Sequence, residues 1–365
     1  NTVGGLQITT TATSNIGLGA NAVNSITTGD YNVGLGDNAG TAITTGTENV
    51  AMGFEALKTH TTGHSNVAIG QEALENNTTA SNNTAVGTKS LRANTTGTEL
   101  TAVGSSAGLA NTTGTRLTAI GFEAGKANTT GVENTFIGRK AGLANTTAAN
   151  NTVVGSFAFA ANTTGANNVA IGKSSLTANT TGVSNVAVGL QSLDANTTGN
   201  SNVALGTSAL GSNTTASNNT AVGHDSLTAN TTGGYNVAIG KDSLKSNTTA
   251  SGNVAVGVDA LETNTTGTTN TGVGTAALKD NTTGGQNTAM GYEALANNTT
   301  AASNTSIGYA SMLANTTGAN NTAVGRQALT SNTTASNNTA VGMSALILNT
   351  GGENTAVGKD ALKAN

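Results

Sequence analysis

The sequence predicts an all-β solenoid, a parallel β-roll or β-helix with one 17-residue coil per repeat. A pentapeptide typified by NVAIG at residues 168–172 recurs along the whole chain. Its closing glycine returns every 17 residues from Gly19 to Gly342, and then after 16 residues at Gly358. Within the pentapeptide, apolar side chains alternate as they do in a short strand. A short unit repeated in strict register is typical of solenoids, in which each coil contacts only its neighbours.

The repeat that begins at Asn168 serves to number the positions of every repeat from 1 to 17. Position 1 is Asn except at Leu100 and Leu117, position 5 is always Gly, and position 9 is Leu in most copies. Twenty repeats occupy residues 15–353, the last shortened by one residue, and a truncated final repeat occupies 354–365.

Both ends of the chain fall inside a repeat. In the segment 1–14, Leu6, Thr10 and Thr11 match positions 9, 13 and 14, which predicts a partial repeat. We therefore expect the sequence to be part of a longer array, because solenoids normally finish in a polar capping unit.

The alternation within the strand predicts which side chains form the core. Positions 2 and 4 share one face, which we expect to line the coil interior together with Leu at position 9. Positions 6 to 10 hold helix formers, so they are expected to form either a single helical turn or a second strand. Positions 12 to 15, Asn-Thr-Thr-Gly or Asn-Thr-Thr-Ala, have the composition of a turn.

A single coil buries too little to fold alone. It hides about three apolar side chains worth about 1.5–3 kcal/mol each, whereas ordering a residue costs on the order of 1–2 kcal/mol. Stacked coils would add backbone hydrogen bonds and align identical side chains about 4.8 Å apart, so that Asn at positions 1 and 12 would form amide ladders. The 21 coils would then form a rod of roughly 100 Å. The position-1 ladder is expected to include Asn66, Asn83, Asn168, Asn185, Asn202 and Asn236.

Composition excludes several classes of function. Only 9% of residues are charged, against about 25% in an average soluble domain, and the absence of cysteine rules out disulfides and thiolate metal sites. The net charge of −4 without basic clusters argues against nucleic-acid binding. No apolar run approaches the ~20 residues of a membrane-spanning helix. We expect no membrane insertion.

No catalytic constellation emerges from the titratable residues. The histidines His60, His64 and His224 lack the partner pattern of a nucleophile or a metal site, and His60 and His64 are expected to be solvated turn residues. Acidic residues at position 7, such as Glu72 and Asp242, are expected to form an exposed solubilising stripe. The sequence thus predicts a protein that is not an enzyme and that uses no cofactor or metal.

Asn-Thr-Thr at position 12 also satisfies the acceptor pattern for N-glycosylation in 16 successive repeats. Glycans about 4.8 Å apart would crowd one another, so a structural turn ladder is favoured over glycosylation. The Thr rows at positions 13 and 14 could also order water as in ice-binding proteins, although a solubilising role is favoured. The acceptor asparagines are Asn77, Asn94, Asn111, Asn128, Asn145, Asn162, Asn179, Asn196, Asn213, Asn230, Asn247, Asn264, Asn281, Asn298, Asn315 and Asn332.

The NVAIG core resembles the head repeats of YadA-like trimeric autotransporter adhesins. The longer pattern GxxALxxNTTGxxN resembles repeat regions of bacteriophage tail fibres and related bacterial surface fibres. The resemblance covers essentially the whole chain and implies a left-handed parallel β-roll in a homotrimer, with strands packed about the threefold axis. In that arrangement the alanine at position 3 would face the neighbouring chains.

The expected function is therefore structural. The chain would form the repetitive shaft of a fibre or adhesin on a cell or virion surface, in the extracellular space, spacing a binding tip from its base. A host or cell-surface receptor would be bound by a tip outside this sequence, or more weakly by the variable positions 6, 7, 16 and 17. The alternatives are an ice-binding protein or a glycosylated extracellular matrix filament.

Overall fold

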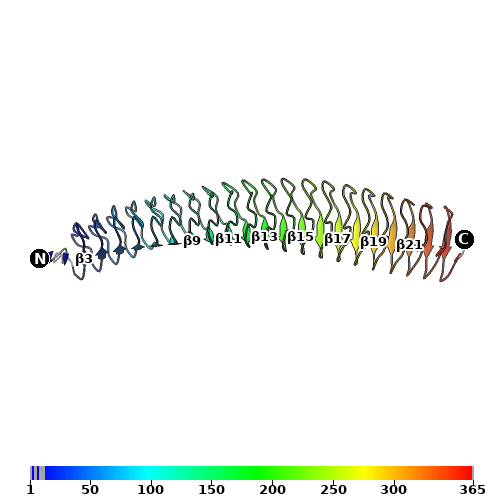
Figure 1. The fold of residues 1–365 in the computed structure, drawn as a ribbon, viewed down its shortest axis with the longest axis horizontal. Helices are drawn as coiled ribbons and strands as arrows, with labels where there is room; N and C mark the ends of the chain where they lie inside the picture. The colour runs from blue at the N-terminus through cyan, green and yellow to red at the C-terminus, as the bar shows by residue number, and fades with distance from the viewer. Residues whose placement is uncertain (1, 4–5, 8–12, 364–365) are drawn as a thin grey trace. The chain divides into compact units, whose positions relative to one another are not determined.

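A computed structural model describes residues 2–3, 6–7 and 13–363 of the chain. It confirms a β-solenoid with parallel strands and one 17-residue coil per repeat (Figure 1). The chain divides into two compact units, Asn1–Ser184 and Asn185–Asn365, which are described separately.

Unit 1 contains ten strands that pair in parallel, each in register with the next coil. They are β3 (Ile16–Leu18), β4 (Val33–Leu35), β5 (Val50–Met52), β6 (Val67–Ile69), β7 (Thr84–Val86), β8 (Thr101–Val103), β9 (Thr118–Ile120), β10 (Thr135–Ile137), β11 (Thr152–Val154) and β12 (Val169–Ile171).

The residues before β3 pair differently. Strand β1 (Thr2–Val3) is antiparallel to β2 (Leu6–Gln7), and β2 is antiparallel to β3. Thr10 and Thr11, which supported a partial repeat at 1–14, lie outside the described residues. The described part of this segment is a hairpin instead of a further parallel rung.

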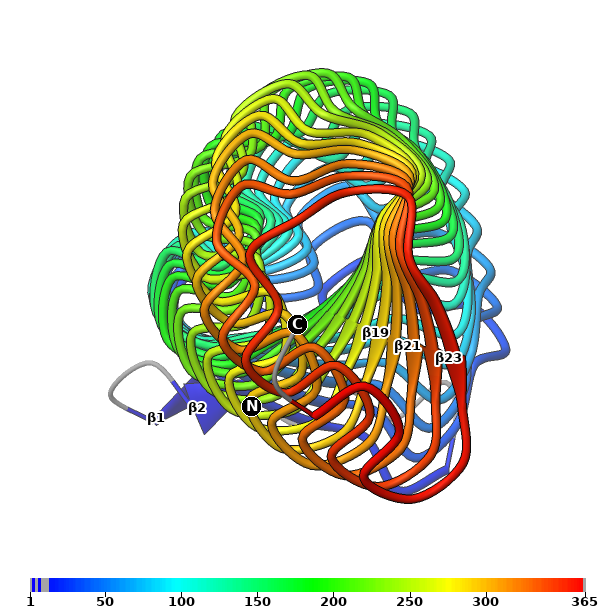
Figure 2. The same ribbon diagram turned by 90° about the vertical axis from the view of Figure 1, so that its right-hand side faces the viewer.

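Unit 2 contains eleven strands that pair in parallel. They are β13 (Val186–Val188), β14 (Val203–Leu205), β15 (Thr220–Val222), β16 (Val237–Ile239), β17 (Val254–Val256), β18 (Thr271–Val273), β19 (Thr288–Met290), β20 (Thr305–Ile307), β21 (Thr322–Val324), β22 (Thr339–Val341) and β23 (Thr355–Val357). Seen end-on, each coil has its strand on one side and turns on the others (Figure 2).

The strands face the opposite way from the prediction. Ala170 at position 3 is fully buried, whereas Ile171 at position 4 is 38% exposed, and the other coils follow the same pattern. The coil interior is narrow: a Cβ placed on Gly272, also at position 3, would lie 3.4 Å from Leu261 Cδ1. Since Leu at position 9 already fills the coil, the strand turns its smallest side chain inward. Position 3 therefore cannot contact a neighbouring chain.

Positions 6 to 10 form neither a helix nor a second strand; residues 13–363 contain no helix. Positions 7 and 9 adopt left-handed backbone, with φ of 56° at Glu72 and 48° at Leu74, which ends a right-handed helix at once. The turn still pairs with its neighbours, since Leu74 N donates to Ser90 O at 3.0 Å. Position 5 requires glycine: φ is 131° at Gly70, and a Cβ there would lie 2.6 Å from the Gly87 backbone.

Where position 9 is glycine, a side chain from another position fills the space that leucine occupies in most coils. At Gly40 the space is filled by Ile43 from position 12, whose Cδ1 would lie 2.9 Å from an added Cβ. At Gly125 and Gly142 it is filled by Phe136 from position 3, whose ring would lie within 2.7 and 2.4 Å of such an atom. Leu, Ile and Phe at different positions of the repeat thus fill the same interior.

Candidate functional site

The asparagines at position 1 form an amide ladder inside the coils. Asn66 N and Nδ2 donate to Asn49 Oδ1 at 3.1 and 2.9 Å, and Nδ2 also donates to Ala80 O at 3.0 Å. The six asparagines named for this ladder are all fully buried. Each donates its Nδ2 to the position-15 carbonyl of its own coil. A buried amide that is fully hydrogen-bonded holds the coils in register.

A second ladder runs along position 12. Asn94 Nδ2 donates to Asn77 Oδ1 at 2.9 Å and to Gly97 O at 3.0 Å, the carbonyl that also accepts from Asn83. All 16 asparagines of the glycosylation pattern are fully buried in this ladder. A glycan attaches to Nδ2, which here carries two hydrogen bonds and has no access to solvent. The folded coils therefore leave no site for N-glycosylation at these residues.

The Thr rows beside this ladder differ from each other. At position 13 the hydroxyl is committed to the backbone, as where Thr78 Oγ1 donates to Thr95 O at 3.1 Å. At position 14 the side chain is exposed, as at Thr79. Only one of the two rows is thus free to meet water, and it lies in a turn.

The three histidines differ in their exposure to solvent. His60 is fully buried, which corrects the prediction that it is a solvated turn residue. His64 and His224 are exposed. His60 takes the place of an asparagine in the position-12 ladder, which the sequence register indicates once the ladder is known to point inward.

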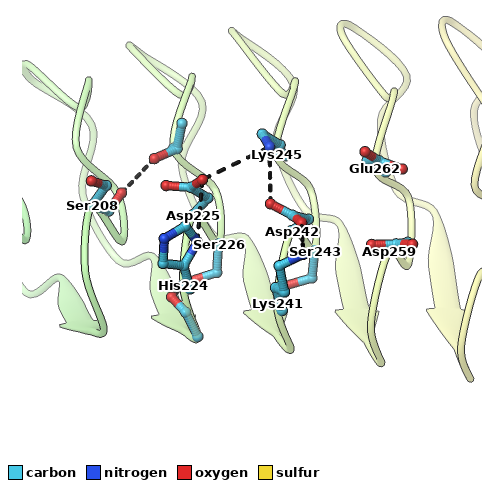
Figure 3. Close-up of polar contacts among 12 residues, drawn as sticks. Ser208, His224, Asp225, Ser226, Lys241, Asp242, Ser243, Lys245, Asp259 and Glu262 are labelled. Atoms are coloured by element: carbon cyan, nitrogen blue, oxygen red, sulfur yellow. Dashed lines mark hydrogen bonds and ion pairs between the residues drawn. The ribbon is translucent and has the colours of Figure 1, made fainter.

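His224 lies beside two carboxylates in unit 2. Potential ligand atoms of His224, Asp225 and Asp242 lie within 4.8 Å of one another. Lysines already occupy the position of a cation, because Lys241 Nζ lies 2.9 Å from Asp242 Oδ2 and Lys245 Nζ lies 3.0 Å from Asp242 Oδ1 (Figure 3). Although burial opposes it, hydrogen bonds from these lysines lower the pKa of Asp242. The cluster is an ion-pair network that a metal would have to displace.

An open depression of about 490 Å³ lies next to this network. It exists because Gly211 and Ser208 place little or no side chain between the coils of Asp194 and Asp225. Burial raises the pKa of Asp194. The described lining includes no histidine or cysteine; its polar side chains are Gln191, Asp194, Ser208, Ser212, Asp225 and Thr228.

The outward side of the strands carries a row of exposed or half-buried apolar side chains in each unit. We call it the strand face and define it as positions 2 and 4 of every coil from β3 to β12 and from β13 to β23. Position 2 is Val, Thr or Ile and position 4 is Val, Ile, Leu or Met, so the strand face carries no charge. Position 4 is substantially exposed, with Ile239 at 40% and Met290 at 44%.

Apolar side chains continue onto position 6 at one border of the strand face. Phe54 and Phe122 are exposed there in unit 1. In unit 2, Tyr292 and Tyr309 stack with ring centroids 5.4 Å apart, and Arg326 lies over the Tyr309 ring at 5.8 Å. Charged residues gather instead at positions 7 and 10, as in the pairs Lys58–Glu55 and Lys126–Glu123. Positions 2 and 4 thus carry no charge, whereas the charged side of the coil, centred on positions 7 and 10, extends to position 6 at residues such as Arg139, Lys173 and Lys241.

Among the described residues, no helix is long and apolar enough to cross a membrane. The chain matches no protein-family model and no curated protein sequence.

Proposed function

We propose that this chain is a non-enzymatic structural shaft, the repetitive part of a fibre or adhesin that spaces a binding tip from its base on the outside of a cell or virion. The observation that carries the proposal is the rung-on-rung backbone pairing of strands and turns within each unit, to which two buried asparagine ladders add over most of the coils. Such pairing resists bending and makes length proportional to the number of repeats.

The shaft associates with further copies of itself through the strand face, as a homotrimer. The position-4 row of Val, Ile, Leu and Met runs along ten or more coils in each unit, and a long exposed apolar row of this kind is typical of an interaction surface. Its rows repeat with the 17-residue period of the chain, so a second copy matches it along its whole length. The threefold arrangement rests on the resemblance to trimeric adhesin repeats. Position 4, and not the alanine at position 3, meets the partner chains.

Single cysteines test this assembly, because the natural chain contains none. In native protein, Ile171→Cys should resist a maleimide, form interchain disulfides on oxidation, and become reactive when the particle is dissociated. Thr181→Cys, on the exposed position-14 row, is the matched control and should react throughout. Ala170→Cys, inside the coil, should react only after unfolding. Equal native reactivity at positions 171 and 181 would exclude self-association through the strand face.

An ice-binding function is the second candidate, and we assign it to the strand face instead of the Thr rows in the turn. Each strand from β18 to β23 begins with Thr and ends with Val, Ile or Met on the outward side. These residues form a regular array on extended strands, whereas the position-13 hydroxyls bond to the backbone. The same array cannot both bind ice and be buried between chains. Thermal hysteresis together with native labelling of Ile171→Cys would favour ice binding; its absence at high protein concentration would remove this candidate.

A further inference from the structure

His60 stands at the head of the position-12 ladder in unit 1. Its imidazole is fully buried. Nε2 lies 2.9 Å from Gly63 O, and Nδ1 lies 2.9 Å from Asn77 Nδ2. A carbonyl oxygen can only accept and an amide nitrogen can only donate. The ring is therefore neutral, with its proton on Nε2 donated to Gly63 and the Nδ1 lone pair accepting from Asn77.

Histidine fits the ladder at this rung and not further along it. An internal asparagine such as Asn94 donates two N–H bonds, to Asn77 Oδ1 and Gly97 O, and accepts one. A neutral imidazole has one N–H and one acceptor, so it suits a rung that has no amide before it. The preceding coil has Ile43 at position 12, which satisfies this condition.

We propose that His60 is an acid-sensitive cap of the position-12 ladder: protonation of Nδ1 replaces the acceptor of Asn77 with a donor and loosens the coils that follow. Asn77 cannot accommodate the change by rotating its amide, because its Oδ1 accepts from Asn94 Nδ2 at 2.9 Å. The same donor-to-acceptor direction continues from Asn94 through Asn111 to Asn128. Reversing one rung would oppose two N–H groups at the next.

Burial lowers the pKa of His60, and the neighbouring charge of His64 lowers it further. The backbone groups of Gly63 and Asn77 oppose this shift without reversing it. The coil before contributes Ile43 and the coil after contributes Asn77 at the ladder position, and neither is ionisable. Because the pKa is lower in the folded than in the unfolded chain, stability is complete above the usual histidine pKa of about 6.5. It is lost as the pH falls below that value.

Amide hydrogen exchange of the coils around Asn77 and Asn94 tests the proposal. After correction for intrinsic exchange, acidification from pH 7 to pH 5 should raise their opening constant by up to about 25-fold in the wild type. His60→Asn, which continues the ladder with an amide, should remove this dependence. His64→Asn, at an exposed site, should leave it unchanged. A pH dependence that persists in His60→Asn would overturn the proposal.

A measurement on the unmodified chain guards against a variant that fails to fold. Nitrogen NMR of the wild-type imidazole should show a neutral ring protonated on Nε2, with a pKa below the usual histidine value. Titration of His60 at the usual histidine value, with the following coils still protected from exchange, would equally overturn the proposal.

Discussion

Two regions of the molecule fill the same coil in different ways. In residues 219–269 of unit 2, every coil has Asn at position 1, Ala at position 3 and Leu at position 9. In residues 100–159 of unit 1, position 9 is Gly in three coils. The missing volume comes from Leu91 and Leu117 beside Gly108, and from Phe136 beside the other two glycines, all essentially fully buried. The coil interior thus requires a fixed volume more than a fixed residue at each position.

The leucines that replace asparagine at position 1 in unit 1 interrupt one of the two asparagine ladders. Leu100 and Leu117 interrupt the position-1 ladder, where Asn83 Oδ1 accepts from the backbone of Leu100 at 3.0 Å. The position-12 ladder continues past the same coils, from Asn94 to Asn111 and Asn128. One continuous ladder is sufficient to hold the register there.

The largest expected effect is the loss of Phe136. Phe136→Ala leaves a cavity that neither Gly125 nor Gly142 can fill, and should destabilise unit 1 by about 3–5 kcal/mol in urea unfolding. Gly142→Leu in the same chain converts the coil to the unit 2 pattern and should recover much of the loss. Phe54→Ala, at a half-exposed site, is the control. If the double variant were no more stable than Phe136→Ala, volume exchange would be the wrong explanation.

Placing a leucine at position 1 of a unit 2 coil, where position 9 of the preceding coil is already leucine, should be destabilising. Asn253→Leu imitates Leu117, but the preceding coil carries Leu244 where unit 1 has Gly108. The new side chain would overpack the coil. It would also remove the hydrogen bonds of the Asn253 amide, which donates to Gly267 O and accepts from Asn270 N, at a cost of at least about 2 kcal/mol. Adding Leu244→Gly should reduce that cost. Urea midpoints of the single and double variants check the prediction, and identical midpoints would refute it.

The smallest effect is expected on the charged side, where the two regions should behave alike. Lys126→Ala in unit 1 removes the pair with Glu123, and Lys245→Ala in unit 2 removes the pairs with Asp242 and Asp225. Because both lysines lie at the surface, each change should cost at most about 1 kcal/mol. The hydrogen bond from Lys126 lowers the pKa of Glu123, so this stability is present above pH ~4.5 and lost as the pH falls. The difference between Lys126→Ala and wild type in thermal unfolding should therefore shrink from pH 7 to pH 3.

The period and the glycine at position 5 were sufficient to predict the solenoid and the stacking of Asn66 and Asn83. The orientation of the strand was not predictable in the same way. The alternation rule assigns the more apolar face of a strand to the core, and it therefore placed Val169 and Ile171 inside. It takes no account of how little room Leu176 leaves in the coil interior. The left-handed residues at positions 7 and 9 were missed for a related reason: helix formers such as Leu74 show propensity, but stacking in the coil overrides it.

His60 shows a further limit of sequence reasoning. Its place at position 12 was visible, yet its burial depends on the direction in which that position points. Phe136 is the converse case. Phe136 replaces the alanine usual at position 3, but its role became clear only when Gly125 and Gly142 were found beside it.

The mass of the particle in solution tests the central claim most directly. Sedimentation equilibrium of the wild-type chain should give three times the chain mass of 35.4 kDa, with the strand faces buried between copies. A stable particle of 35.4 kDa at micromolar concentration would contradict the account and leave the strand face exposed as the surface of a single-chain solenoid.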